Sequence, residues 1–272
     1  MFFHWWRDRR RRKLAGEPFP AEWLDIVRRN CRHFATLSEP EQTRLLRDTR
    51  WFIDEKSIEA AIGLTLTDEM RVTVAVHASL LGLGFAAPPF DRLVSVVLQP
   101  ESYFRTKVHR ESSGLELHAE EERLGEAWRN GPVLLSWRDI VEQCREFPNG
   151  RNVILHEFAH LLDMADADAD GIPPLDTEEQ YRTWLDVTGI EYRRLVRHAQ
   201  QGRRTLLDWY GATNEAEFFA VATECFFEQS TEMCDVHPHL YEVLKAFYKQ
   251  DPAGRGKFEI SNPKSETNFK FE

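Results

Sequence analysis

The sequence predicts an α+β fold that is mostly helical and contains a small mixed β-sheet. Several long stretches place apolar residues at helical spacing, whereas only two short runs are rich in branched apolar residues, which favour strands. The chain has 272 residues, of which 42% are hydrophobic and 29% are charged. This composition is ordinary for a globular protein, and the length suffices for one large domain or two small ones.

Composition divides the chain into a central domain and two tails. Residues 20–252 hold the periodic segments, with an N-terminal lobe up to about residue 147 and a second lobe over residues 148–252. Residues 253–272 are polar and lack periodicity, so we expect a loose C-terminal tail. We expect residues 1–19 to form the other tail.

The N-terminal tail combines aromatic and basic residues. Trp5 and Trp6 precede segment 7–13, which contains six basic residues and one acidic residue and therefore carries +5. Aromatic residues beside such a cluster can contact an anionic membrane surface or nucleic acid, but we expect a solvated, mobile tail. The whole chain carries −10, which leaves −15 outside this segment and argues against nucleic acid as a direct partner.

Neither a signal peptide nor stable membrane insertion is expected. The positive charge follows the aromatic residues, whereas a signal peptide places its charge first. The longest apolar run, residues 72–89, is interrupted by polar residues and ends in two prolines, so we expect a core helix there. The four cysteines form no Cys-x-x-Cys pair, which favours reduced thiols, a cytoplasmic location and no thiolate zinc site.

The first lobe contains the segments with strand character. Residues 93–98 predict a buried strand because the run is short and rich in branched residues, and residues 132–137 predict a second strand. Turn signals predict a small hairpin or meander over residues 103–131. Helical spacing or capping signals predict helices over residues 22–34, 38–52 and 138–147, and Thr67 or Asp68 can start the core helix that contains the apolar run 72–89.

Residues 153–164 contain the pattern His-Glu-x-x-His within an apolar frame. On a helix, at about 100° per residue, His156 and His160 lie one turn apart on one face, with Glu157 beside them. Two neutral imidazoles at this spacing can share a tetrahedral zinc ion, and Glu157 can take a proton from water at the metal. With ten histidines in the chain, the pattern can also arise by chance in an ordinary helix.

An acidic loop follows the motif. Asp163 shares the face of the two histidines, where it could orient a ligand imidazole or simply face water at the helix end. The run from Asp166 to Gly171 resembles the start of a calcium loop, but Thr177 stands where that loop needs a bidentate Glu, so we expect a solvated loop. Further helices are predicted over residues 177–203, 214–228 and 237–249.

A zinc site of this kind needs a third protein ligand. One longer zinc-binding pattern requires Gly and His three and six residues after the second His, and Asp163 and Asp166 occupy these positions instead. The other option is a Glu on a second helix, for which Glu217 and Glu224 are candidates because they share one apolar-flanked face. Asn214 and Glu217 also form a capping-box pattern, so the role of Glu217 could be purely structural.

The strand before the motif helix has two interpretations. An exposed edge at residues 133–137 could pair with an extended peptide substrate and hold it over the metal. Alternatively, these residues form an interior strand that has no contact with a substrate. The residue pattern leaves both interpretations open.

Several segments together resemble the Mlc titration factor A family. They are residues 131–137, 156–164, 171–175, 210–221, 225–228 and 247–252. The resemblance spans roughly residues 20–252 and does not include the extreme termini. That family is similar to the catalytic domain of anthrax lethal factor, a zincin, so the resemblance implies a zincin-like metallopeptidase fold.

The resemblance also implies roles for the site residues. It implies one zinc ion per chain, with His156, His160 and Glu217 as ligands and Glu157 as the general base. It places Tyr210, seven residues before Glu217, beside the metal, where a phenol can stabilise an oxyanion. Without the resemblance, Tyr210 would be interpreted as a packed aromatic residue at a helix entry.

Two functions of different classes follow from the resemblance. The first is a cytosolic zinc-dependent peptidase, aminopeptidase-like, that hydrolyses small peptide substrates. The second is a non-catalytic anti-repressor that regulates sugar-uptake genes, because family members bind the glucose repressor Mlc and keep it from its operator. The aromatic and basic start of this chain departs from the family pattern.

Overall fold

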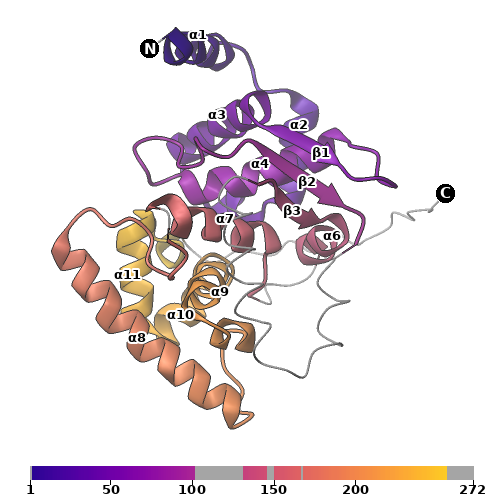
Figure 1. Cartoon of the computed structure of the whole chain (residues 1–272). Coiled ribbons are helices and arrows are strands. Elements are labelled where there is room, and N and C mark those ends of the chain that lie inside the picture. The colour runs from indigo at the N-terminus through magenta and orange to yellow at the C-terminus, as the bar shows by residue number, and fades with distance from the viewer. Residues whose placement is uncertain (1, 102–130, 146–149, 167, 256–272) are drawn as a thin grey trace.

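The computed structural model describes residues 2–101, 131–145, 150–166 and 168–255 (Figure 1). Within these ranges the chain is mostly helical with one small sheet, as the sequence predicts. The α-helices are α1 (Phe2–Ala15), α2 (Ala21–Asn30), α3 (Glu39–Glu55), α4 (Asp68–Gly82), α6 (Trp137–Arg145), α7 (Val153–Asp163), α8 (Glu178–Gln200), α9 (Glu215–Glu228), α10 (Ser230–Val236) and α11 (Pro238–Tyr248). Short 3₁₀ helices include η1 (Arg32–Thr36), η3 (Met164–Asp166), η4 (Trp209–Ala212) and η5 (Ala253–Arg255).

A three-stranded sheet lies in the N-terminal half of the chain. Its strands are β1 (Ser57–Ala60), β2 (Ser95–Gln99) and β3 (Val133–Ser136), in that spatial order. All pairings among these described strands are parallel, whereas a mixed sheet was predicted. The hairpin or meander predicted over residues 103–131 lies almost entirely outside the described residues. Strand β3 packs beside α7. That it pairs with an extended peptide substrate stays a prediction.

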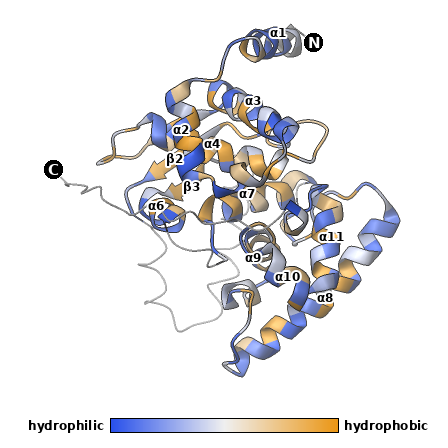
Figure 2. Cartoon of the chain, turned by 180° about the vertical axis from the view of Figure 1, so that it is seen from behind, coloured by the Kyte–Doolittle hydropathy of each residue, from blue (hydrophilic) through white to orange (hydrophobic). Residues whose placement is uncertain are grey.

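Helix α4 forms the centre of the N-terminal half. Nearly all of its side chains from Met70 to Gly82 are buried, and Figure 2 shows its largely hydrophobic colouring. A helix that is apolar on all sides is stable only when other elements surround it, and α4 packs against α2, α3 and α7. Across the described residues, no helix combines the length and the apolar character that crossing a membrane requires.

The C-terminal half is a group of helices joined by aromatic packing. Trp184 of α8, Phe219 of α9 and Phe247 of α11 contact one another, with ring centroids 5.6–6.0 Å apart. Helix α7 lies between the two halves, because it packs against α4 on one side and α9 on the other (Figure 1). The motif helix is therefore held from both sides.

The N-terminal segment differs from the expected solvated, mobile tail. Residues 2–15 form α1, which lies along α3 at one edge of the molecule (Figure 1). Arg10 pairs with Asp54 and Arg11 pairs with Glu55, each at 2.5 Å. These partners stand 44 residues further along the chain, so local patterning gave no sign of them.

The first three residues of the predicted C-terminal tail are ordered in a short helix. Residues Ala253–Arg255 form η5, and the Arg255 guanidinium donates to Glu41 at 2.8 Å. The remainder, residues 256–272, lies outside the described residues. The proposed division into one domain with two lobes and two tails otherwise stays a prediction.

Candidate metal centre

Helix α7 presents the two histidines of the motif on one face. Asn152 caps the helix, because its Oδ1 accepts the N–H of Leu155 at 3.2 Å. One turn separates His156 from His160, and their Nε2 atoms lie 3.3 Å apart. Leu155 and Phe158 are fully buried on the remaining surface, which fixes the direction of the histidine face.

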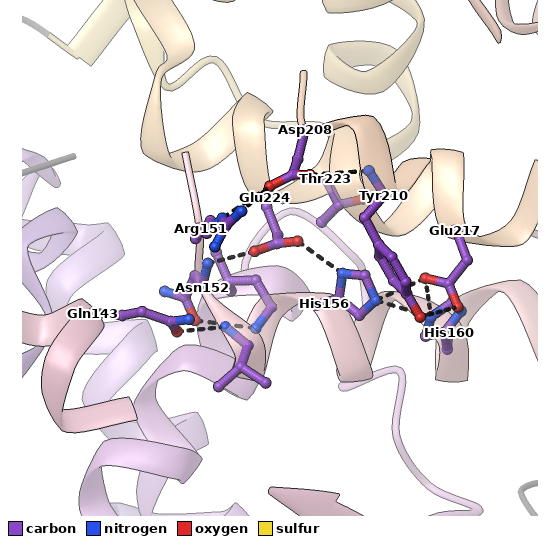
Figure 3. A network of polar contacts seen from close by, with 12 residues as sticks. Gln143, Arg151, Asn152, His156, His160, Asp208, Tyr210, Glu217, Thr223 and Glu224 are labelled. Atoms are coloured by element: carbon purple, nitrogen blue, oxygen red, sulfur yellow. Dashed lines mark hydrogen bonds and ion pairs between the residues drawn. The ribbon is translucent and has the colours of Figure 1, made fainter. Parts of the chain in front are cut away.

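Helix α9 brings Glu217 to the histidines. Asn214 caps α9 by accepting the N–H of Glu217 at 2.8 Å, so half of the predicted capping box forms. The carboxylate of Glu217 contacts the imidazoles: its Oε2 lies 3.0 Å from Nε2 of His156 and 3.5 Å from Nε2 of His160. Figure 3 shows the three side chains converging from the two helices. The backbone N–H of Glu217 therefore takes part in the helix cap, and its side chain contributes to the site.

The separations of these donor atoms fit one metal ion. His156, His160 and Glu217 form a group whose ligand atoms all lie within 4.8 Å of one another. In a tetrahedral site with zinc bonds of about 2.0–2.1 Å, neighbouring ligand atoms lie about 3.3–3.4 Å apart. The observed separations of 3.0, 3.3 and 3.5 Å are close to this edge length. Two imidazoles and one carboxylate also leave a fourth position for water or substrate.

Glu224, the other candidate for the third ligand, occupies a different place. Its Oε1 lies 2.7 Å from Nδ1 of His156, and its Oε2 accepts the N–H of Asn152 at 2.5 Å. An ionised carboxylate only accepts, so Nδ1 donates a proton to Glu224, and Nε2 is the nitrogen that faces Glu217 and can bind a metal once it is deprotonated. A carboxylate in this position orients a metal-binding imidazole and increases its basicity. Glu224 is therefore the partner of a candidate ligand rather than a ligand.

The charges around His156 alter its protonation. Burial acts to lower the pKa of His156, but the carboxylates of Glu224 and Glu217 outweigh burial and raise that pKa well above its usual value. Burial acts to raise the pKa of Glu217, yet hydrogen bonds to His156 and His160 hold it far below its ordinary range. The two carboxylates thus supply negative charge that can balance a cation between the histidines.

Glu157 lies next to His156 on α7 and is half-buried. Burial raises the pKa of its carboxyl above the ordinary value, against the opposing charges of His156 and His160. A raised pKa brings a carboxylate closer to the pH at which a general base works best.

Tyr210 lies beside the histidines on η4. Its hydroxyl donates to Oε1 of Glu217 at 3.3 Å, and its ring centroid is 5.9 Å from that of His156. Asp208 holds this turn, because its Oδ1 accepts the N–H of Tyr210 at 2.9 Å while its Oδ2 accepts from Nε of Arg151 at 2.9 Å (Figure 3). Tyr210 is 53% exposed, so a ligand that reaches the site can contact it.

Asp163 is tied to the loop that follows the motif helix. It is fully buried, so the alternative that it faces water is wrong. Its Oδ2 accepts the N–H of Gly171 at 3.0 Å, and burial raises the pKa of its carboxyl to about 6. The observed hydrogen bond gives Asp163 a role in closing the acidic loop, and the expectation that it orients an imidazole stays a prediction.

The polar network next to Glu224, which includes Asn152 and Glu228, was not predicted. Asn152 donates through Nδ2 to Oε1 of Glu228 at 2.7 Å, and Glu228 is buried beside Arg32 and His33. The spacing of Glu224 and Glu228, one turn apart on a helix that is otherwise apolar at its centre, was the available signal. Buried carboxylates need partners, so acidic residues on such a helix indicate a polar network.

This site defines the class of protein: a helix carries His-Glu-x-x-His, and a second helix supplies a Glu to complete a metal-binding group. Residues 3–249 match the family described as glucose-regulated metallo-peptidase M90, and the chain belongs to that family.

The chain is also similar over most of its length to several known proteins. It is 34% identical over 249 residues to the uncharacterized protein slr2042 of Synechocystis sp., covering 91% of this chain and 90% of that protein. It is 28% identical to two proteins named Mlc titration factor A. The alignment with the Serratia proteamaculans protein covers 86% of this chain and 89% of the relative, and that with the Yersinia pestis protein covers 87% of each. These matches confirm the resemblance drawn from the motifs.

Proposed function

We propose that the chain is a cytoplasmic zinc-dependent peptidase that acts on small peptides in an aminopeptidase-like manner. The observation that carries this proposal is the convergence of His156, His160 and Glu217 at separations suited to one tetrahedral ion, with Glu157 adjacent. Membership of a metallopeptidase family supports the same assignment. One zinc ion per chain would occupy this position.

Each site residue has a defined chemical task in this proposal. A zinc ion held by His156, His160 and Glu217 supplies Lewis-acid polarisation of the scissile carbonyl and a lower pKa for water. Glu157 takes a proton from the attacking water and later delivers it to the leaving amine. The hydroxyl of Tyr210 donates a hydrogen bond to the oxyanion that develops on the carbonyl oxygen.

Metal analysis combined with a peptide-substrate screen tests this function. We expect one zinc per chain, hydrolysis that stops when a chelator removes the metal, and recovery when zinc is returned. Glu217→Ala removes one ligand and should lower the metal content sharply, whereas Glu215→Ala, at an exposed position of the same helix, should leave it unchanged. Full zinc occupancy in Glu217→Ala would overturn the ligand assignment.

A second function is favoured by the relatives named Mlc titration factor A. We propose that the chain also binds a repressor of the Mlc kind through protein contacts, without contacting DNA directly. Binding of purified repressor to wild type and to Glu157→Gln distinguishes the two functions. Equal binding by both proteins, together with no hydrolysis of any peptide by the zinc-loaded wild type, would favour a non-catalytic anti-repressor. Absence of repressor binding would remove that function.

A further inference from the structure

Helix α1 has two opposite faces with different chemistry. Its inner face consists of Arg7, Arg11 and Leu14, which are half-buried and fall within an arc of about 60° at 100° per residue. The outer face spans about 120° on the opposite side of the helix. Its members are all exposed: Trp5, Trp6, Arg9, Arg12 and Lys13.

Ion pairs and ring contacts hold the inner face against the body. Arg7 pairs with Asp91 at 3.0 Å, and Arg11 pairs with Glu55 at 2.5 Å. The guanidinium of Arg11 also lies 4.9 Å from the ring centroid of Trp51, whose Nε1 donates to the carbonyl oxygen of Arg11 at 3.2 Å. These contacts orient α1, so its outer face is directed to solvent.

The outer face combines exposed tryptophans with cations. Trp5 is 50% exposed and Trp6 is 61% exposed, and the guanidinium of Arg9 lies 5.6 Å from the Trp5 ring centroid. Within the described part of the chain, no carboxylate forms an ion pair with Arg9, Arg12 or Lys13. Adjacent exposed tryptophans beside cations that no described carboxylate pairs with are suited to a surface that is partly apolar and negatively charged.

We propose that the outer face of α1 binds the surface of an anionic phospholipid bilayer. Tryptophan is favoured at the level of lipid headgroups, and each nearby Lys or Arg adds attraction to anionic headgroups. Duplex nucleic acid is a poorer match, because its recognition depends on polar contacts to phosphates and bases rather than on exposed indole rings. Helix α1 lies at the edge of the molecule beyond α3, away from α9, so lipid contact there does not involve the residues of the metal-binding group (Figure 1).

Co-sedimentation of the full chain with lipid vesicles tests the proposal. The probes are vesicles of phosphatidylcholine alone and vesicles of phosphatidylcholine and phosphatidylglycerol in equal amounts. We expect binding to the anionic vesicles that weakens at high salt, and little binding to the neutral ones. The triple variant R9Q/R12Q/K13Q should bind about 100-fold more weakly, at roughly fivefold per basic residue. The variant W5A/W6A should also lose affinity, because it removes the interfacial rings.

A matched control removes the same charge elsewhere. Arg193, Arg197 and Arg203 are exposed on or just after α8, so R193Q/R197Q/R203Q should bind anionic vesicles like wild type. Equal loss of binding in this control, equal binding to neutral vesicles, or no vesicle binding by wild type would overturn the proposal. Tighter binding of a DNA duplex, abolished by R9Q/R12Q/K13Q, would also overturn it and mark a nucleic-acid surface. Because the described metal-binding group contains no residue of α1, peptide hydrolysis should be unchanged in all these variants.

Discussion

Tyr210 has two candidate roles that depend on different atoms of one side chain. Its ring lies 5.9 Å from the ring of His156 and could serve as packing at the entry to α9. Its hydroxyl lies 3.3 Å from Glu217 and could donate to a charge that develops at the metal centre. Packing needs only the ring, whereas oxyanion stabilisation needs the O–H group, so one substitution separates the two roles.

Tyr210→Phe keeps the ring and removes only the donor. Loss of one oxyanion donor usually costs about 2.7–4 kcal/mol, so we expect turnover to fall by roughly 10²–10³. The fall should appear equally in kcat and kcat/KM, because the interaction is made only in the transition state. Steady-state kinetics on a small peptide measure both values, with Tyr181→Phe as the control at an exposed tyrosine of α8.

Two outcomes of the same kinetic experiment would contradict the proposed role of the Tyr210 hydroxyl. A raised KM at constant kcat would make Tyr210 a substrate-binding residue. Activity equal to wild type would assign the ring to packing alone. Zinc content and melting temperature should stay near wild type, since neither a ligand nor core volume is lost.

Individual site residues differ in how far the sequence could predict them. His156 and His160 follow from helix geometry alone, because four residues on a helix return to the same face. Glu217 stands 61 residues from His156, so its position depends on how α7 and α9 pack. Spacing therefore left Glu217 and Glu224 as equal candidates, and only the resemblance favoured Glu217. The structure separates them by the imidazole nitrogen that each one contacts.

At the scale of elements, α9 determines the geometry of α7. Glu224 contacts both Nδ1 of His156 and the N–H of Asn152, and Glu228 contacts the side-chain amide of Asn152. Asn152 also caps α7 through its Oδ1. One helix therefore positions the start of the motif helix and the orientation of a candidate ligand together.

Glu224→Gln should weaken zinc binding by roughly 10–100-fold, because carboxylates behind a ligand imidazole typically contribute that much. Glutamine keeps the shape but replaces one acceptor oxygen by a donor, so either His156 Nδ1–H or the N–H of Asn152 loses its partner. Competition with a chromophoric chelator measures the affinity without reference to catalysis. Glu215→Gln, exposed on the same helix, is the control and should bind zinc like wild type.

Unchanged zinc affinity in Glu224→Gln would be inconsistent with this positioning role. If the melting temperature of the metal-free variant falls at the same time, Glu224 acts only in the packing of α7 against α9.

Whole elements also differ in how well the sequence predicts them, according to whether the contacts that fix them are local or distant in the sequence. The capping-box pattern at Ser38 predicts the start of α3, because the signal lies within the first turn of the helix, and the structure forms a capping box there and at Thr177, where α8 starts. Helix α1 was not predicted, because what fixes it are partners such as Asp54, Glu55 and Asp91, which lie far along the chain. Tertiary contacts of this kind leave no local pattern.

Over the whole molecule, the metal centre lies where the two halves meet. Helix α7 packs against α4 of the N-terminal half and α9 of the C-terminal half. Further contacts join the halves, including the pairing of Arg32 with buried Glu228 and the donation from Nε2 of Gln250 to the carbonyl oxygen of Leu80 at 2.9 Å. A site built on helices that are held from both sides keeps its donor atoms at nearly fixed separations.

Peptide hydrolysis by Glu157→Gln, measured on samples of known zinc content, tests the proposed peptidase function most directly. Glutamine preserves the volume of the side chain and leaves His156, His160 and Glu217 in place, so zinc content should equal that of wild type. Hydrolysis should fall by roughly 10²–10⁴, the usual contribution of a general base. Hydrolysis at the wild-type rate by the zinc-loaded variant would contradict the assignment of Glu157 as the base.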